Sequence, residues 1–523
     1  MTTSITPPTA VEATIERWIA TFASPYANVS DLLCDRHDPE TVAFTIVEPD
    51  LSSCDLTYGE LADRSRRLAT VLADQGVGRG DRVPVLMGKR PELLVALLAI
   101  WRLGAVHVPL FTAFATGAIR MRVEGAGARL VITEPDQRSK VDAIDGLAVL
   151  AVGPELDSLV DASTPFSPSV AIGGEGAMVQ LYTSGTTGKP KGVVVPVRAL
   201  AAFSCYLHYG LDVTEDDVFW NAADPGWAYG LYYAILAPMV SGRRNILFNS
   251  GFTPESTLAV LTEFGVTNFA GAPTVYRALS KSGLTEQLQI RRASSAGEPL
   301  TPDIVAWATH ALGTEVRDHY GQTELGMVVA NCWHPDAAHP LKEASMGQAI
   351  PGFTAGVVNG QIAIDVHNSP LMWFIGYHDD PSKSAERFNN DAHWYLTGDT
   401  GHVDTDGYFF FSARDDDVIL AAGYRIGPFD VESVLITHRS VVDVAVVGRP
   451  DPEGIRGEVI EAFVVLATGE EPSTDLAEEL KQLVRQEYSK HAYPRSVHFV
   501  ETLPKTPSGK LQRYLLRSNH SQH

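Results

Sequence analysis

The sequence predicts a mixed α/β and α+β protein in which a large N-terminal domain precedes a small α+β domain. Three observations lead to this prediction. The 523-residue chain is too long for one ordinary hydrophobic core, so it should divide into several folding units. Helical and strand patterns alternate from Leu56 onward, which is typical of doubly wound parallel sheets. After Asn331, short strands rich in turn residues replace that alternation.

The alternating region forms two series, and each predicts one doubly wound α/β subdomain. Apolar residues every three to four positions indicate the helices, and short apolar runs indicate the strands. The first series is helix 58–75, strand 81–86, helix 91–103 and strand 105–109. The second is strand 177–182, helix 198–209, strand 219–221, helix 227–239 and short strands at 245–248, 266–270 and 293–296.

The remaining third of the chain predicts two smaller units. Strands at 356–366 and 408–411 suit a small antiparallel β-barrel or sheet, which would complete an N-terminal domain spanning 1–415. The tail, 416–523, has about the size of an independent domain. Its predicted elements are helix 429–437, strand 442–448, strand 458–466 and helix 474–488.

Composition excludes several classes of partner. The chain carries 41 basic and 63 acidic residues, a formal net charge of −22, which would repel nucleic acid and an anionic membrane surface. The four cysteines form no CxxC pair, so a disulfide framework and a zinc-cysteine site are not expected, and a cytoplasmic location fits best. The start of the sequence does not read as a secretory signal. The most apolar window, 93–110, is interrupted by Arg102, so no integral membrane span is predicted.

The sharpest motif follows the apolar strand at 177–182. Glycines there allow tight turns with N–H groups pointing inward, while hydroxyls and lysines supply donors suited to a polyphosphate. The spacing is not that of a Walker A loop, since two residues separate Gly185 from Gly188 and Pro190 follows Lys189. The alternative is a polar surface hairpin. The candidate polyphosphate-binding residues of this loop are Thr183, Ser184, Gly185, Thr186, Thr187, Gly188, Lys189 and Lys191.

This loop resembles the signature phosphate loop of the adenylate-forming superfamily, which includes acyl-CoA synthetases, luciferases and the adenylation domains of peptide synthetases. Further matching segments extend from Leu56 to Arg513, and the closest resemblance is to medium-chain acyl-CoA synthetases. The resemblance implies an enzyme that uses ATP, Mg²⁺ and CoA. It would join a carboxylic acid to the CoA thiol through an acyl-adenylate, releasing AMP and pyrophosphate.

The resemblance assigns the nucleotide site to three further segments. Gly297, Glu298 and Pro299 would line the adenine pocket. Asp399, with Arg414, would bind the ribose hydroxyls, although the two could simply form a local ion pair. In the third segment the aromatic residue would stack on adenine, Thr323 would touch the α-phosphate, and Glu324 would bind Mg²⁺, the alternative for Glu324 being an exposed carboxylate at a helix start. The residues of that segment are Asp318, His319, Tyr320, Gly321, Gln322, Thr323 and Glu324.

In the C-terminal domain the resemblance implies mobility and supplies a catalytic lysine. The domain would rotate about Asp416 between the two half-reactions, although this acidic stretch also suits a solvated turn. Gly423, Tyr424 and Arg425 would meet the pantetheine arm of CoA. Lys510 would bridge the attacking carboxylate and the α-phosphate, whereas a lysine in such a loop is ordinarily solvent-exposed.

The acyl pocket is less defined by the sequence. Acetate-specific relatives place a tryptophan where this chain has Gly321, so the resemblance implies an acid larger than acetate: medium-chain, branched, aromatic or bulky. Trp227 would form a pocket wall or, equally well, belong to the core. Two alternatives remain open: loading of a carrier-protein thiol, and a catalytically inactive protein that binds nucleotides or acyl-CoA. The oligomeric state is open as well, a homodimer being one option.

Overall fold

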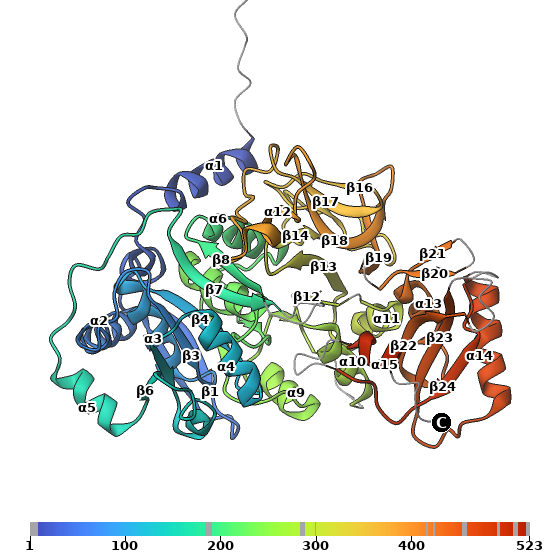
Figure 1. Ribbon diagram of the computed structural model, residues 1–523, viewed down its shortest axis with the longest axis horizontal. Coiled ribbons are helices and arrows are strands. Elements are labelled where there is room, and N and C mark those ends of the chain that lie inside the picture. The colour runs from blue at the N-terminus through green and yellow to red at the C-terminus, as the bar shows by residue number, and fades with distance from the viewer. Residues whose placement is uncertain are drawn as a thin grey trace, which may run out of the picture.

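The computed structural model describes residues 9–183, 191–282, 288–298, 300–414, 417–421, 424–451, 458–488, 492–505 and 511–518. It has a large N-terminal domain and a small C-terminal domain that lies to one side of it (Figure 1). The N-terminal domain contains two large sheets and one small antiparallel sheet. The mixed α/β class predicted from the sequence is therefore confirmed.

The first large sheet has six strands in the order β6-β5-β3-β4-β7-β8. Its neighbours are parallel except β8, which runs antiparallel to β7. Strand 177–182, assigned from the sequence to the second series, is β7 and pairs with β4 in this first sheet. The bounds are β3 (Arg82–Leu86), β4 (Val106–Leu110), β5 (Leu130–Thr133), β6 (Ala148–Ala151), β7 (Ala177–Thr183) and β8 (Lys191–Pro196).

The second large sheet has nine strands in the order β15-β14-β13-β12-β11-β9-β10-β1-β2. Its centre is parallel, and antiparallel strands close both ends. Two strands come from the start of the chain, β1 (Val42–Val47) and β2 (Ser53–Thr57). The others are β9 (Phe219–Asn221), β10 (Asn245–Phe248), β11 (Asn268–Gly271), β12 (Arg292–Ala296), β13 (Val316–Gln322), β14 (Gly326–Ala330) and β15 (Gln348–Ala349).

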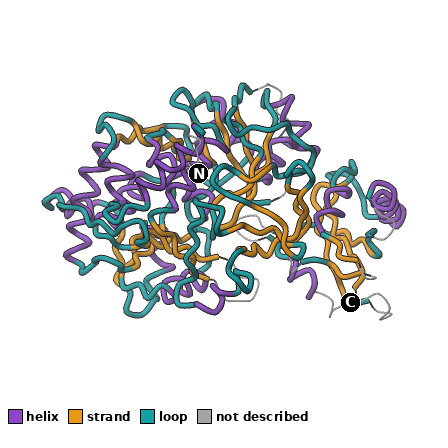
Figure 2. The backbone as a smooth tube through the Cα atoms, turned by 90° about the horizontal axis from the view of Figure 1, so that it is seen from above, coloured by secondary structure: helices purple, strands orange, loops and turns teal. Residues whose placement is uncertain are grey.

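Helices flank both sheets, as the tube view shows (Figure 2). The best-specified is α2 (Tyr58–Asp74), where Thr57 and Glu60 form a reciprocal capping box that satisfies backbone N–H groups. A continuous helical run extends over α7 (Ala228–Gly230), the π-helical segment Leu231–Leu236 and α8 (Ala237–Ser241). The other α-helices of this domain are α1 (Ala10–Phe22), α3 (Pro91–Arg102), α4 (Thr116–Gly125), α5 (Pro154–Ala162), α6 (Ala199–Cys205), α9 (Pro254–Glu263), α10 (Pro273–Lys281), α11 (Pro302–Ala311) and α12 (Pro381–Ala385).

The small unit predicted as an antiparallel barrel or sheet takes the sheet form. Its order is β16-β17-β18-β19. A closed barrel needs its first and last strands to pair, whereas this order, over the described residues, is open. The bounds are β16 (Ala355–Val358), β17 (Gln361–Asp365), β18 (Trp394–Val403) and β19 (Phe409–Arg414).

The C-terminal domain has its own core. In its main sheet β22 pairs antiparallel with β23, and β24 joins β23 in parallel. Val431, Leu435, Val446, Val464 and Leu480 are buried together between this sheet and the helices. The elements are β20 (Ile419–Ala421), β21 (Tyr424–Ile426), α13 (Pro428–Leu435), β22 (Val441–Pro450), β23 (Glu458–Leu466), α14 (Thr474–Glu487), β24 (Ser496–Phe499) and α15 (Arg513–Ser518).

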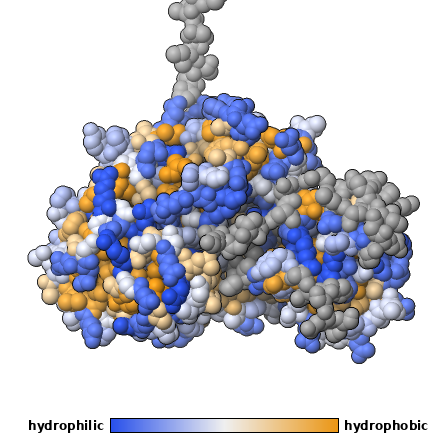
Figure 3. All heavy atoms as spheres, viewed as in Figure 1, coloured by the Kyte–Doolittle hydropathy of each residue, from blue (hydrophilic) through white to orange (hydrophobic). Residues whose placement is uncertain are grey.

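The surface carries polar and apolar residues side by side. On the face drawn in Figure 3, hydrophilic residues are widespread and separate smaller apolar patches. Within the described ranges, no helix combines the length and the apolar character needed to cross a bilayer.

Candidate active site

The predicted nucleotide-binding segments meet where parallel strands of the nine-stranded sheet end. β12 and β13 are adjacent and parallel, so Gly297 and Glu298 after β12 lie beside the segment that closes β13. The carboxyl edge of such a sheet is the usual place for ligands. Gly297 has a φ of +104°, which favours glycine, and the Glu298 carboxylate is 2.8 Å from Arg277. Pro299, predicted with them, lies outside the described residues.

The small antiparallel sheet brings Asp399 to the same edge. Asp399 is buried, and one of its carboxylate oxygens accepts two hydrogen bonds of 2.6 Å, from the Tyr320 hydroxyl and the Gln322 side-chain amide. Gln322 also donates to the Thr397 carbonyl at 2.9 Å. Two residues predicted to touch ATP therefore hold the predicted ribose ligand in place. This contact brings together residues that lie far apart in the sequence.

Arg414 faces the other oxygen of Asp399. The two residues are opposite one another in the β18–β19 ladder, and Arg414 Nε lies 3.9 Å from Asp399 Oδ1. Burial raises the pKa of Asp399 above its usual range, and Arg414, Tyr320 and Gln322 oppose that rise because they favour the ionised form. The local ion pair considered from the sequence is thus present, at a distance that leaves room for further hydrogen-bond partners.

Glu324 is buried, with 5% of its surface exposed. The alternative interpretation of Glu324 as an exposed carboxylate at a helix start therefore does not hold. Its Oε1 accepts a 2.7 Å hydrogen bond from the Tyr377 hydroxyl and lies 3.7 Å from Arg387. Arg387 Nε in turn donates to the Tyr377 oxygen at 2.7 Å. Both contacts of Glu324 fall on Oε1, so within the described residues Oε2 stays available for a cation. A hard carboxylate oxygen of this kind fits Mg²⁺.

The two ends of the phosphate loop reach this network. Thr183 and Lys191 are paired across β7 and β8, so the two residues that flank 184–190 lie side by side. The Lys191 ammonium lies 5.2 Å from the centre of the Tyr377 ring. Burial lowers the pKa of Lys191, and neighbouring Arg387 and Lys383 lower it further. Ser184, Gly185, Thr186, Thr187, Gly188 and Lys189 lie outside the described residues.

His319 and Asp318, two residues of the predicted nucleotide segment, have side chains in which burial disfavours the charged form. His319 is 2% exposed, with Nδ1 2.7 Å from the Tyr206 hydroxyl and Nε2 3.2 Å from the Asn331 carbonyl. Because a carbonyl only accepts, Nε2 carries the proton, and burial lowers the pKa of His319 to about 3. Burial also raises the pKa of Asp318 to about 7. Both ring nitrogens of His319 therefore have partners within the protein.

Trp227 stands where the two large subdomains meet. Its ring is 5.5 Å from that of Phe111 and 5.2 Å from that of Phe114, and both phenylalanines follow β4 of the first sheet. The buried indole N–H has no acceptor among the described residues. The helical run after Trp227 is fixed to the catalytic segment, because the Tyr232 hydroxyl donates to the Thr323 carbonyl at 2.9 Å.

Gly321 is constrained by backbone packing. A β-carbon at this position would lie 2.2 Å from the Gly326 carbonyl oxygen and 2.6 Å from Met327 Cα, both on the adjoining strand. The strand register also shifts between Tyr320 and Gly321. A glycine is therefore needed here for close strand approach, and its presence alone does not measure the size of the acyl pocket.

We expect Gly321→Ala to destabilise the protein by about 1–3 kcal/mol, because the added methyl group can be accommodated only by moving backbone. The measurement is the thermal unfolding midpoint of the purified variant. Gly251→Ala is the matched control, since nothing lies within 4 Å of a β-carbon there. Equal midpoints for the two variants would contradict this packing argument.

The predicted C-terminal residues are described only in part. Lys510, Asp416 and Gly423 lie outside the described residues, and Tyr424 and Arg425 belong to β21 by their backbone. The helix that follows the Lys510 loop is anchored beside the predicted hinge, because Arg513 and Arg517 contact the carboxylate of Asp417 at 3.4 and 2.6 Å. Arg513 also makes two 2.8 Å bonds to Glu432.

Tyr377 and Arg387 are two site residues that sequence reasoning missed. Both come from the excursion 366–393 between β17 and β18, which precedes Asp399 but contains no residue of a recognised motif. Their role depends on side-chain contacts with Glu324, for which local periodicity carries no signal. A tyrosine and an arginine in a turn-rich segment ordinarily indicate surface.

Comparison with known proteins identifies the class. Residues 34–365 match the AMP-binding enzyme family model, and residues 430–510 match the model of the AMP-binding enzyme C-terminal domain. The chain therefore belongs to the AMP-binding enzyme family.

Individual relatives and solved structures show which type of enzyme within this family the chain resembles. The chain is 35% identical to the acetyl-coenzyme A synthetase of Bacillus subtilis (strain 168), covering 88% of this chain and 84% of the relative. It is 34% identical to the mitochondrial acyl-coenzyme A synthetase ACSM3 of Homo sapiens, covering 92% and 86%. A solved Brucella canis acyl-CoA synthetase is 42% identical with a TM-score of 0.75 over 96% of both chains. A benzoate CoA ligase from Burkholderia xenovorans LB400 is 29% identical with a TM-score of 0.84 over 94% and 100%. The chain is an AMP-forming acyl-CoA ligase that uses ATP and CoA, and Mg²⁺ is the typical metal of its family.

Proposed function

We propose that this ligase activates an acid larger than acetate in two steps, and that residues of both domains take part in the reaction. In the first step a carboxylate oxygen attacks the α-phosphorus of ATP, the acyl–AMP bond forms and pyrophosphate leaves. In the second the CoA sulfur attacks the acyl carbon, its proton is lost and AMP leaves. The observation that carries the proposal is the convergence of Tyr320, Gln322 and Asp399 beside Glu324 at one sheet edge.

In this proposal Asp399 accepts from the ribose hydroxyls, with its carboxylate already oriented by Tyr320 and Gln322. Thr183, Lys191 and the loop between them hold the phosphates, and Thr323 contacts the α-phosphate. Glu324 holds Mg²⁺, which when bound would neutralise phosphate charge. Positioning and charge neutralisation carry phosphoryl transfer, so no nucleophilic triad is required.

We further propose that the domains divide at Asp416, into 1–415 and 416–523, and that the smaller one reorients between the two steps. Lys510 would serve adenylation, and Gly423, Tyr424 and Arg425 would contact the pantetheine arm during thioester formation. The two family matches end and begin on opposite sides of this boundary, which supports the division. The contacts of Arg513 and Arg517 with Asp417 would carry the lysine loop along with the residues next to the hinge.

The acid itself is the least constrained part of the proposal. Trp227, with Phe111 and Phe114, supports an aromatic-lined pocket, and the structural likeness to a benzoate CoA ligase supports a bulky or aromatic acid. The likeness to an acetyl-coenzyme A synthetase favours a small one. A carrier-protein thiol remains the alternative acceptor.

The test is pyrophosphate release with MgATP over acetate and a panel of straight, branched, aromatic and polycyclic acids, each with and without CoA. We expect CoA-stimulated turnover with a class of acids larger than acetate. A response to acetate alone would overturn the substrate proposal. Adenylate formation with no acyl-CoA product would instead favour the carrier-protein acceptor.

We propose a cytoplasmic setting on the basis of the thiols. Cys34, Cys205 and Cys332 are buried and unpaired, and Cys54 is exposed and unpaired, which supports a reducing, cytoplasmic location. Small molecules are the proposed partners. A homodimer is a further option that light scattering on the purified protein distinguishes from a monomer.

A further inference from the structure

A cluster of metal-ligating side chains lies at the base of the excursion 366–393, away from the nucleotide site. β17 ends at Asp365 and β18 begins at Trp394, and these two residues are paired. The Val366 N–H donates to the His393 carbonyl at 2.9 Å, which closes the base of the excursion. The same excursion carries Tyr377 and Arg387 to Glu324. A ligand that holds the base of this excursion in place would therefore also help to hold Tyr377 and Arg387 against Glu324.

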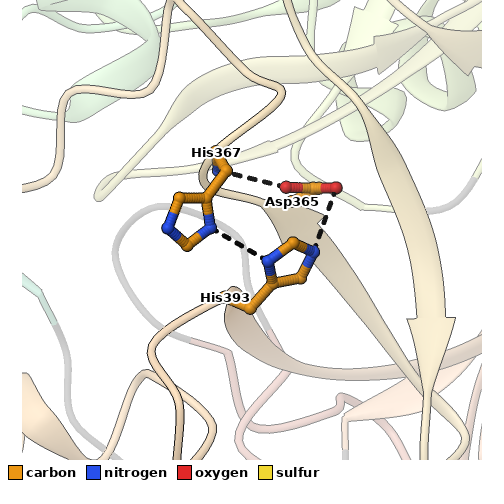
Figure 4. Close-up of side chains that lie close together, drawn as sticks. All are labelled: Asp365, His367 and His393. Atoms are coloured by element: carbon orange, nitrogen blue, oxygen red, sulfur yellow. Dashed lines mark hydrogen bonds and ion pairs between the residues drawn. The ribbon is translucent and has the colours of Figure 1, made fainter.

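Three side chains converge there, as Figure 4 shows. A carboxylate oxygen of Asp365, a ring nitrogen of His367 and a ring nitrogen of His393 all lie within 4.8 Å of one another. His367 Nδ1 is 2.9 Å from His393 Nδ1, and His393 Nε2 is 3.3 Å from Asp365 Oδ2. Two imidazoles and one carboxylate form a donor set that binds late first-row divalent cations.

The carboxylate of this set is already held in place. Asp365 is buried, and its oxygens accept from the His367 N–H at 3.0 Å, the Asn368 N–H at 3.1 Å and the Asn368 side-chain amide at 2.8 Å. These three hydrogen bonds fix the orientation of the Asp365 carboxylate. The His367 side chain is exposed, and its ring stacks on that of His393 with 4.8 Å between the ring centroids. A carboxylate oriented beforehand next to two imidazoles suits closure around a cation.

Of the two contacts of His393, the one that Nδ1 makes with His367 has an ordinary hydrogen-bond length of 2.9 Å, whereas the one that Nε2 makes with Asp365 is too long for a strong hydrogen bond. A charge-assisted N–H···O bond is about 2.7–2.9 Å long, shorter than the 3.3 Å between His393 Nε2 and Asp365 Oδ2. Ligand bonds of about 2.0–2.2 Å in a tetrahedral zinc site place neighbouring donor atoms about 3.3–3.5 Å apart. The Asp365–His393 separation already equals one edge of such a site.

We propose that Asp365, His367 and His393 form a three-ligand site for a divalent cation of the zinc class, with the fourth position taken by water. Mg²⁺ is excluded as the occupant because it demands oxygen ligands. The cation would tie the end of β17 to the start of β18 and so close the excursion between them. Closing a long loop restricts the unfolded chain most, so the site should stabilise the protein.

The binding test uses the full chain, freed of metal with a chelator and titrated with Co²⁺. We expect one equivalent to give the intense visible absorption of a four-coordinate site, displaced by Zn²⁺ and unaffected by excess Mg²⁺. His367→Ala and His393→Ala should abolish that spectrum. Because Asp365 is itself a ligand, Asp365→Asn should weaken binding by more than the about tenfold that the loss of a ligand-orienting group costs. His402→Ala is the matched control, since His402 stacks on Phe410 further along β18 and lies outside the cluster.

A thermal melt provides the second readout. Zn²⁺ should raise the unfolding midpoint of the unaltered chain and of His402→Ala, and leave those of His367→Ala and His393→Ala unchanged. Circular dichroism verifies that each variant is folded. A spectrum or a Zn²⁺-dependent shift that survives in both histidine variants, or is absent from the unaltered chain, would overturn the proposal. Neither readout requires acyl-CoA formation, so failure here is distinguishable from failure of the proposed function.

Discussion

Replacing Lys510 by alanine is expected to slow adenylation by about 10²–10³-fold, the usual effect of removing one group that stabilises charge in a transition state. The carboxylate and the α-phosphate are both anions, and the lysine would bridge them as they approach. Thioester formation from supplied acyl-AMP and CoA should stay within a few-fold of the unaltered enzyme, because no second anion approaches phosphorus in that step. The two half-reactions are measured separately, by pyrophosphate release and by acyl-CoA formation from synthetic acyl-AMP.

Lys505→Ala is the matched control for this experiment. Lys505 precedes the same loop, but its ammonium pairs with the carboxylate of Asp443, so its loss should leave both half-reactions nearly unchanged. If Lys510→Ala slowed both half-reactions equally, the lysine would have a general structural role and its assignment to adenylation would fail.

Glu324→Gln is the second change with a large expected effect. It removes the carboxylate charge that would hold Mg²⁺ and leaves Arg387 facing a neutral amide. We expect adenylation to fall by about 10²-fold or more, the range for loss of a preorganised electrostatic group, and the Mg²⁺ concentration for half-maximal rate to rise. A Mg²⁺ titration of pyrophosphate release measures both quantities.

Tyr377→Phe separates metal binding from support of the carboxylate. It removes the 2.7 Å hydrogen bond to Glu324 and the 2.7 Å hydrogen bond from Arg387 while keeping both charges, so it should lower the free energy of unfolding by about 1–3 kcal/mol and leave the Mg²⁺ midpoint nearly unchanged. If Glu324→Gln reduced the rate and the stability with no change in Mg²⁺ dependence, Glu324 would be a structural partner of Arg387.

The fold was predictable where a signal is local. The Thr57 and Glu60 capping box marks the start of α2, and the apolar runs at 219–221 and 458–466 become β9 and β23 with the same bounds. Sheet membership was not predictable in the same way. β7 joins the first sheet through β4, and β1 joins the second through β10, because pairing depends on partners distant in sequence that periodicity does not encode.

The same distinction between local and long-range signals applies to the candidate site. The motifs containing Tyr320, Glu324 and Asp399 were recognisable, and the structure brings them to one sheet edge. The contacts of individual motif residues were not recognisable from the sequence. His319 is buried against Tyr206, and the adjoining strand leaves no room for a side chain at Gly321. Tyr377 and Arg387 carry no motif, and their contribution exists only through contacts with Glu324.

The central claim, activation of the acid through an acyl-adenylate, is tested most directly with a carboxylic acid labelled in both oxygens with a heavy isotope. One labelled oxygen bonds to phosphorus in the adenylation step and stays on phosphorus when CoA displaces AMP from the acyl carbon, so mass spectrometry of the nucleotide product should find AMP carrying one heavy oxygen. Unlabelled AMP, or ADP together with labelled phosphate, would contradict the account.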